Sequence, residues 1–422
     1  MRAIYFCVAL FSVTATAVHG DDFALKDGDT VAYLGDSITA ARAYGKLVEN
    51  YTLLRFPERK VRFINVGRGG DTAAGGLARL KEDVFDRGTT VLTVAYGIND
   101  IGWGTKADDE HRNLYLNSLR EICRQCKEKN VRVYICSAAA TASDPDKSEN
   151  DYLKQMCDEG MQIGRDHGAG AIDVQGEMRK IQRKIKEAND REKPEKDKEH
   201  TLHAKDGIHL NDLGQIAFAY AVIKGLGGPA EVSSASVDAK SLDVVASGCR
   251  VSDVSTTSKG GVEFTRLDQG LPLNGETFFA LNFRFVPIPE ELNRYMLAVP
   301  SLEPGRYTVT VDGRTVGTFP ANQLAKGVNI ASSTADPWQP GGPWMAQGNI
   351  LQQLTEARDK LDMTRLLTGA HLKERDLPKE LAAPVATTNG QIEDMQRAIA
   401  KPRPYRFSIR KAAESDAKKT GG

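Results

Sequence analysis

The first half of the chain alternates between two hydrophobic patterns. Short continuous runs of apolar and β-branched residues, typical of strands buried on both faces, occur at 30–35, 61–66, 90–97, 131–137 and 169–174. Amphipathic stretches with helical spacing separate them, at 40–54, 72–86, 108–129 and 148–167, and a last one covers 212–224. This alternation predicts an α/β fold, a three-layer α/β/α flavodoxin-like domain in which helices cover both faces of a parallel sheet.

The pattern changes near residue 228, where GGPAEVSSAS is typical of a linker. The residues that follow have strand character, at 261–267, 277–286, 294–299 and 305–319. The last of these stretches contains Asp312-Gly313 between alternating apolar positions, which is a strong hairpin signal. We therefore expect the α/β domain to cover 21–228 and an appended β-rich accessory domain to cover 231–330.

The remaining residues, 331–422, begin with a Pro/Gly-rich loop that contains Trp338 and Trp344. The two indoles could stack on sugar rings or pack a seam between domains. Residues 345–400 have helical composition with breaks expected near Pro378 and Pro384, and 403–411 could form a closing strand. We thus expect a C-terminal helical segment.

Residues 183–205 are very polar and carry mixed charges. This composition predicts either the end of a solvated helix followed by a mobile loop, or a lid over a cleft.

The first 20 residues have a different composition from the rest. One basic residue, Arg2, precedes an apolar run and then small residues, with cleavage plausible after Ala17 or Gly20. This layout is that of a secretory signal peptide, although a buried first strand or helix would have the same apolar run. We expect a secreted or periplasmic protein whose mature form is soluble, because no other apolar stretch has the length needed to span a membrane.

The charge balance limits the kinds of binding partner that we expect, and the cysteine content limits the expected thiol chemistry. Lys+Arg and Asp+Glu are equal at 56 each, so no overall field attracts nucleic acid or an anionic membrane. We expect no nucleic-acid partner, no stable membrane insertion and no cofactor. Five cysteines follow the N-terminal stretch, an odd number that leaves at least one free thiol. Cys123 and Cys126 form a C-x-x-C, but their helical spacing with neighbouring leucines favours a buried helix face over redox or zinc chemistry.

Four short blocks carry the candidate chemistry, and three of them directly follow a predicted strand. Ser37 lies in GDSI after the first strand, glycines crowd the block NVGRGGDT at 65–72, and Asn99 lies in YGINDIGWG. The fourth block, AKDGIHLND, places Asp206 three residues before His209, within reach of its imidazole. Each block alone fits an ordinary turn or helix cap. Because a parallel sheet gathers strand ends at one edge, together they supply a nucleophile, a base, an orienting acid and oxyanion donors.

These blocks, in this order, resemble those of the SGNH, or GDSL, hydrolase superfamily, with GDSI in place of GDSL. The resemblance covers about 35–210. It implies Ser37, Asp206 and His209 as a catalytic triad, and the backbone N–H groups of Ser37 and Gly70 with the Asn99 amide as an oxyanion hole. Exported members with appended β domains resemble carbohydrate esterases, so the implied activity is hydrolysis of acyl, chiefly acetyl, esters. The implied substrate is an acylated small molecule or polysaccharide.

Several alternatives stay open on sequence alone. The same chemistry serves lipases, thioesterases and O-acyltransferases, and a non-catalytic binding module with a relic site is a third class. One alternative is a metal site, since three possible ligands recur at three-residue spacing: His203, Asp206 and His209. Another is that His203 and not His209 is the base. The family block favours His209 as the base and no metal. We also expect Asp36 and Trp103, beside Ser37 and Asn99 in sequence, to contact substrate.

Overall fold

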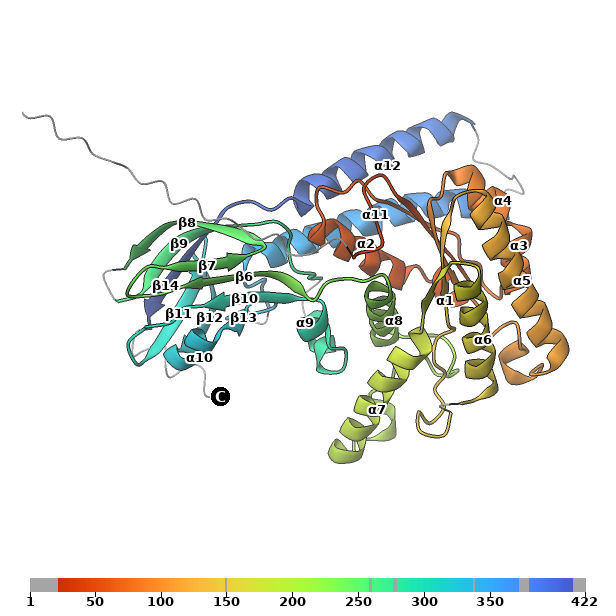
Figure 1. The fold of residues 1–422 in the computed structure, drawn as a ribbon, viewed down its shortest axis with the longest axis horizontal. Helices are drawn as coiled ribbons and strands as arrows, with labels where there is room; N and C mark the ends of the chain where they lie inside the picture. Colours follow the sequence, from red (N-terminus) through yellow and green to blue (C-terminus); the bar gives the residue numbers. More distant parts are fainter. Residues whose placement is uncertain are drawn as a thin grey trace, which may run out of the picture.

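The computed structural model describes residues 22–148, 150–257, 260–275, 279–336, 338–371 and 379–412. The signal peptide expected at 1–20 lies outside these residues. Figure 1 shows a parallel sheet wrapped by helices, a β-rich part beside it, and two long helices, one of which reaches from the sheet into the β-rich part. Within the described residues, none of the helices combines the length and apolar character needed to cross a membrane.

The central sheet has five parallel strands in the order β2-β1-β3-β4-β5. All five coincide with the predicted apolar runs, and their bounds are Thr30–Gly35 (β1), Arg62–Asn65 (β2), Val91–Ala95 (β3), Arg132–Cys136 (β4) and Gly170–Ile172 (β5). Alternate residues of β1 point to opposite faces: Val31 and Tyr33 enter one buried apolar cluster, and Ala32 and Leu34 enter the other. Both faces of the sheet are therefore buried from solvent, as the continuous apolar runs predict.

Helices cover the two faces of this sheet. The face of Val31 packs against α2 (Ala43–Arg55), α7 (Val174–Glu192) and α8 (Asp212–Gly225). The other packs against α3 (Ala73–Ala78), α5 (Asp109–Glu128) and α6 (Tyr152–Asp166). Cys123 and Cys126 are buried on α5, and all five described cysteines are free thiols. The three-layer prediction is confirmed.

One predicted helix is broken. The stretch 72–86 forms α3, then α4 (Leu80–Asp83) and a short 3-10 turn at Phe85–Arg87. Arg79 interrupts the helix with φ −108° and ψ 7°, and its buried guanidinium turns inward to the carbonyl of Val66 and to Asp83. The buried hydrogen bonds of Arg79 and the low helix propensity of two glycines in α3 explain why the amphipathic pattern does not form one continuous helix.

The β-rich part contains two sheets, with strand orders β13-β10-β6-β7 and β12-β11-β14-β9-β8. The strands span Glu231–Val237 (β6), Val244–Ser247 (β7), Cys249–Thr256 (β8), Val262–Asp268 (β9), Arg294–Ala298 (β10), Arg306–Val311 (β11), Arg314–Pro320 (β12), Val328–Asn329 (β13) and Tyr405–Lys411 (β14). The hairpin at Asp312-Gly313 is confirmed, with φ of 48° and 79° at these residues. The appended β-rich part of the predicted fold class is confirmed.

Two details of the β-rich part differ from expectation. The strand predicted at 277–286 is wrong: the described residues form a 3-10 helix at Phe279–Arg284, followed by α9 (Ile288–Glu291). Within 277–286, Phe285 and Val286 are buried whereas Leu281 is exposed. The C-terminal end of this segment therefore packs into the core. The closing strand is confirmed as β14, and it lies between β9 and β11, so the last described residues complete the sheet.

The C-terminal helices α11 (Pro343–His371) and α12 (Lys379–Ala400) confirm the predicted helical segment. The break expected near Pro378 falls outside the described residues, and the break near Pro384 is wrong, because Pro384 lies inside α12. At the sixth position of α12 this proline removes a backbone hydrogen bond and crowds the carbonyl four residues before it, yet the helix continues through it. α11 starts in the β-rich part and runs along α2 (Figure 1), so it joins the two halves.

The two tryptophans near the start of α11 have different environments. Trp344 is fully buried in the β-rich core, packs against Tyr295 and Tyr405, and donates from Nε1 to the carbonyl of Ala331 at 2.8 Å. The alternative of a sugar-stacking role is therefore wrong for Trp344. Trp338 is 74% exposed and remains a candidate for that role.

The polar stretch 183–205 contains the end of α7, which continues to Glu192, and a loop with a 3-10 turn at Lys196–Lys198. Arg284 of the β-rich part pairs with Glu192, and the ring of Phe285 lies 5.0 Å from that of His200. The loop is thus attached to the β-rich part at two points. Mobility and a lid role stay predictions.

Candidate active site

Ser37 lies just after the carboxyl end of β1, the second strand of the parallel sheet. Asp36 caps the short helix α1 (Ser37–Ala40): its Oδ1 accepts from the N–H of Ile38 at 2.9 Å. Ser37 is the first residue of this helix, so its hydroxyl stands at the sheet edge where strand ends meet. The Nε2 atom of His209 lies 2.9 Å from Ser37 Oγ, although the two residues are 172 positions apart.

Asp206 holds the other side of the imidazole. Its Oδ2 lies 2.6 Å from Nδ1 of His209, while its Oδ1 accepts from the N–H groups of Ile208 and His209. The hydrogen bond from His209 lowers the pKa of Asp206 to about 2, helped by the two backbone N–H groups. A carboxylate at Nδ1 fixes the tautomer in which Nε2 presents its lone pair to the serine hydroxyl.

A closed loop presents these two side chains. A β-bridge joins His203 to Leu210, the N–H of Ala204 donates to the carbonyl of His209 at 2.8 Å, and Gly207 turns with φ +72°. His203 itself is buried with Nε2 2.6 Å from the carbonyl of Ala140, and burial lowers its pKa. The structure thus places His209, and not His203, at Ser37.

Gly70 and Asn99 lie on the loops after β2 and β3, the two strands that flank β1. Gly70 has φ +72°, and no atom lies within 4 Å of the position a Cβ would take. The amide Nδ2 of Asn99 donates to the carbonyl of Asp71 at 3.0 Å, which ties the two loops together. Among the described residues, the backbone N–H groups of Ser37 and Gly70 donate to no protein acceptor. Such N–H groups are available to an anion.

Residues 33–216 match the model of the GDSL-like Lipase/Acylhydrolase family. This domain belongs to that family. The protein is accordingly an ester-hydrolysing enzyme, and the predicted superfamily is confirmed.

Solved structures similar to this chain include one of nearly the same length and others that align with about half of it. A gut microbial diltiazem-metabolizing enzyme aligns over 93% of this chain and 100% of its own, with TM-score 0.79 and 22% identity. An alpha/beta hydrolase from the metagenome of Lake Arreo, Spain, aligns over 49% and 98%, with TM-score 0.41 and 22% identity. An acetylxylan esterase from Geobacillus stearothermophilus aligns over 48% and 96%, with TM-score 0.41 and 18% identity. No curated protein matches the sequence.

A buried network supports the loop that carries Gly70 in the acylhydrolase domain. Asp71 Oδ2 accepts from Arg79 Nη2 at 2.7 Å and from the hydroxyl of Tyr96 at 2.8 Å. Arg79 also donates to the carbonyl of Val66 at 2.6 Å, so one guanidinium joins both ends of the loop. Sequence reasoning missed Arg79, whose only signal is a charge at an apolar position of an amphipathic stretch.

Two buried carboxyl groups lie behind this edge of the acylhydrolase domain. Asp100 Oδ1 accepts from the N–H of Ala73 at 2.9 Å, and burial raises the pKa of Asp100 to about 7. Burial likewise raises the pKa of Asp36 to about 6. Asp36 is 4% exposed and caps α1, a position that suits support of Ser37; its predicted contact with substrate stays a prediction.

Trp103 lies at the edge of the site, as its sequence position suggested. Its side chain is 49% exposed, and its ring centre lies 5.7 Å from that of His209 in an edge-on arrangement. The indole therefore forms part of the surface that a substrate approaching Ser37 would meet.

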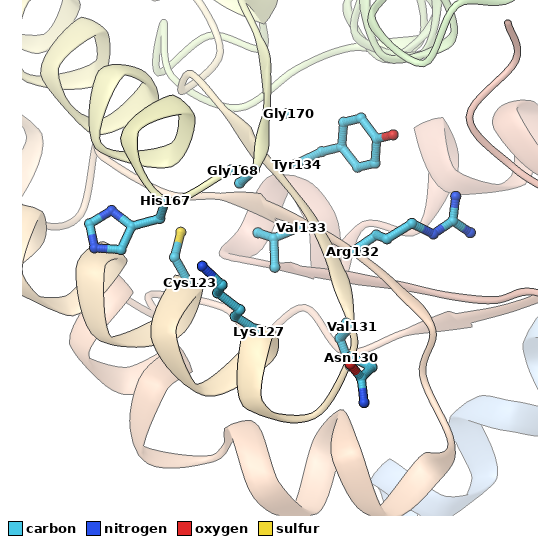
Figure 2. A pocket seen from close by; sticks show the side chains of 11 residues that line it. Cys123, Lys127, Asn130, Val131, Arg132, Val133, Tyr134, His167, Gly168 and Gly170 are labelled. Atoms are coloured by element: carbon cyan, nitrogen blue, oxygen red, sulfur yellow. The ribbon is translucent and has the colours of Figure 1, made fainter.

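A separate hollow of about 500 Å³ opens at the other edge of the sheet (Figure 2), where β4 and β5 begin. Its lining includes Cys123, Lys127, Arg132 and His167. Arg132 is already paired with Asp29 at 2.5 Å. Because Ser37 follows the carboxyl end of β1, this hollow is not part of the candidate active site.

Proposed function

We propose that this protein is an exported serine esterase that removes acyl groups, chiefly acetyl, from carbohydrate, with Ser37 as nucleophile. One observation carries the proposal: His209 lies between Ser37 Oγ, 2.9 Å from Nε2, and Asp206 Oδ2, 2.6 Å from Nδ1. A nucleophile, a base and an orienting carboxylate in that order are what serine hydrolysis of an ester requires.

In the first half of the reaction, His209 Nε2 takes the proton of Ser37 as Oγ attacks the ester carbonyl. The imidazolium that forms is stabilised by Asp206. The lowered pKa of Asp206, about 2, keeps that group ionised throughout the neutral range.

The tetrahedral oxyanion takes hydrogen bonds from the backbone N–H groups of Ser37 and Gly70 and from Nδ2 of Asn99. The positive φ of Gly70 and the link from Asn99 to Asp71 support this assignment, because they fix both donors on one pair of loops. Donors fixed before the reaction need no reorganisation as charge develops.

His209 then gives its proton to the leaving alcohol as the tetrahedral intermediate collapses to the acyl-enzyme, and in the second half it activates a water molecule against that acyl-enzyme. Ser37 regains its proton, and the carboxylic acid leaves. The products are the free hydroxyl of the carbohydrate and acetate.

The openness of the site supports an ester of a bulky alcohol. The side chains of His209 and Asp206 are 38% and 37% exposed, so the reacting groups lie at the surface. An ester that projects from a large molecule reaches such a site without entering a tunnel. The exposed indole of Trp103 offers an apolar face on which a sugar ring could stack.

The experiment measures hydrolysis of p-nitrophenyl acetate and of a long-chain p-nitrophenyl ester, followed by acetate release from a panel of acetylated polysaccharides. We expect acetate release by the native enzyme and a loss of several orders of magnitude in Ser37→Ala. Ser252→Ala, on β8, is the matched control. Full activity of Ser37→Ala would reject the nucleophile, and cleavage of only the long-chain ester would favour a lipase or thioesterase.

The proposed export depends on residues 1–20, where one basic residue precedes an apolar run and then small residues. N-terminal sequencing of the protein recovered from the medium or periplasm tests it. A mature protein that starts near residue 18 or 21 agrees with cleavage after Ala17 or Gly20.

A further inference from the structure

Trp103 has an unusual backbone conformation for a large side chain. Its φ of 57° and ψ of 31° are left-handed, and it lies between Gly102 and Gly104, whose φ values are 52° and 95°. A residue with a Cβ rarely adopts this conformation without a compensating contact. The N–H of Trp103 donates to the carbonyl of Ile98 at 2.9 Å, which closes the turn and directs the indole back toward Asn99.

The compensating contact is with the amide of Asn99. Trp103 Nε1 lies 2.9 Å from Asn99 Oδ1, and Asn99 Nδ2 lies 3.0 Å from the carbonyl of Asp71. An indole N–H can only donate and a backbone carbonyl can only accept, so both neighbours select the same orientation of the amide. One of the two N–H bonds on Nδ2 is used by Asp71, which leaves the second for another acceptor.

The same indole also contacts the imidazole. The rings of Trp103 and His209 meet edge-on, with centres 5.7 Å apart and planes at 72°. Trp103 therefore touches both a proposed oxyanion donor and the proposed base, and it links the loop after β3 to the loop at 204–210.

We propose that Trp103 is a positioning residue for the oxyanion hole: its indole N–H holds Oδ1 of Asn99 so that the free N–H of Nδ2 faces the developing oxyanion. The inference rests on the proposed function, in which Asn99 is an oxyanion donor. Trp103 acts through Asn99, so its indole N–H affects the transition state and not the binding of the ester.

The first test is Trp103→Phe, which keeps an aromatic ring beside His209 and removes the N–H. On p-nitrophenyl acetate we expect kcat to fall about ten-fold, a part of the about 10²–10³ that loss of an oxyanion donor costs, with KM within about two-fold of the native value. An unchanged kcat, or a loss confined to KM, would overturn the proposal in favour of a substrate-stacking indole.

A double-mutant cycle with Asn99→Ala separates action through Asn99 from any other effect. If Trp103 acts by holding Oδ1, then Trp103→Phe causes no further loss of kcat when Asn99 is already alanine. A second loss of about ten-fold in that background, equal to the loss in the native enzyme, would show an independent role and overturn the proposal.

Two further measurements separate the role of Trp103 from a folding defect and from a failure of the proposed function. If Trp103→Phe unfolds, Trp103→benzothienylalanine replaces only the N–H by sulfur at constant shape, and the same fall in kcat is expected. Ser37→Ala is measured in parallel. Loss of activity in Ser37→Ala with native kcat in both Trp103 variants rejects the role of Trp103 alone, whereas native activity in Ser37→Ala rejects the proposed function itself.

Discussion

Arg42 Nε lies 2.5 Å from Oδ1 of Asp359, although 317 positions of the chain separate the two residues. Arg42 comes two residues after α1, the short helix that begins with Ser37, and it has φ 65°. Its Nη2 also reaches Asp362 at 2.8 Å, so two carboxylates of α11 hold one buried guanidinium. Helix α11 therefore supports the segment directly behind the proposed nucleophile.

Breaking this pair should destabilise the fold. Arg42→Ala leaves Asp359, whose side chain is 10% exposed, without its cation, and loss of one partner of a buried pair costs about 3–5 kcal/mol of the free energy of unfolding. Lys46→Ala is the control, because the pair of Lys46 with Glu356 is more exposed and should contribute less than about 1 kcal/mol. Urea unfolding measures both, and equal losses would contradict the role given to Arg42.

Neutralising Asp206 should slow the proposed reaction without weakening substrate binding. Asp206→Asn can no longer hold Nδ1–H of His209, so we expect kcat on p-nitrophenyl acetate to fall by about 10³–10⁴, with KM nearly unchanged. Asp212→Asn, an exposed residue at the start of α8, makes the same chemical change outside the site and should keep native kcat. A native rate in Asp206→Asn would exclude Asp206 as the orienting acid.

The parts of this fold that the sequence predicted are those with a local signal. A strand buried on both faces is a continuous apolar run, so β1 and β3 were located to within a few residues. Parallel strands bring their ends together at one edge, so the order of the four blocks was enough to predict that Ser37 and His209 meet. Their 2.9 Å separation in the structure agrees with that prediction.

The parts that could not be predicted depend on contacts between distant residues. Nothing in the periodicity of 72–86 indicates that Arg79 turns inward to Val66 and breaks the helix. The insertion of β14 between β9 and β11 joins residues more than 90 positions apart and leaves no local pattern. The hydrogen bond from Trp103 to Asn99 is short-range, but it needs a left-handed backbone that the residue type disfavours.

The two tryptophans near the start of α11 should differ in their response to truncation. Trp344→Ala removes a fully buried ring and its hydrogen bond to Ala331, and we expect the free energy of unfolding to fall by about 3–5 kcal/mol. Trp338→Ala changes a side chain that is 74% exposed, so the change should stay within about 0.5 kcal/mol. Chemical denaturation of both variants checks this, and a large loss in Trp338→Ala would show that its ring is part of the folded core.

The pH dependence of stability should report the buried carboxyl of Asp100. Burial raises its pKa from 3.8 to about 7, with a smaller contribution from the charge of Asp36. Between these two pH values the folded protein holds a proton that the unfolded chain has released. Stability therefore falls as pH rises through this window, and the full cost of ionising the group is present above about pH 7.

Replacing Asp100 by asparagine removes this titration while keeping the size of the side chain. Relative to the native protein, Asp100→Asn should gain about 2–4 kcal/mol of unfolding free energy between pH 4 and pH 8, because it lacks the loss that ionising Asp100 causes, whereas Asp36 titrates in both proteins. Urea unfolding at several pH values measures the difference, with Asp212→Asn as the exposed control that should follow the native curve. A difference between Asp100→Asn and the native protein that does not change with pH would mean that Asp100 is ionised at both ends of the range, and that its unpartnered Oδ2 is satisfied in solution by a donor such as water.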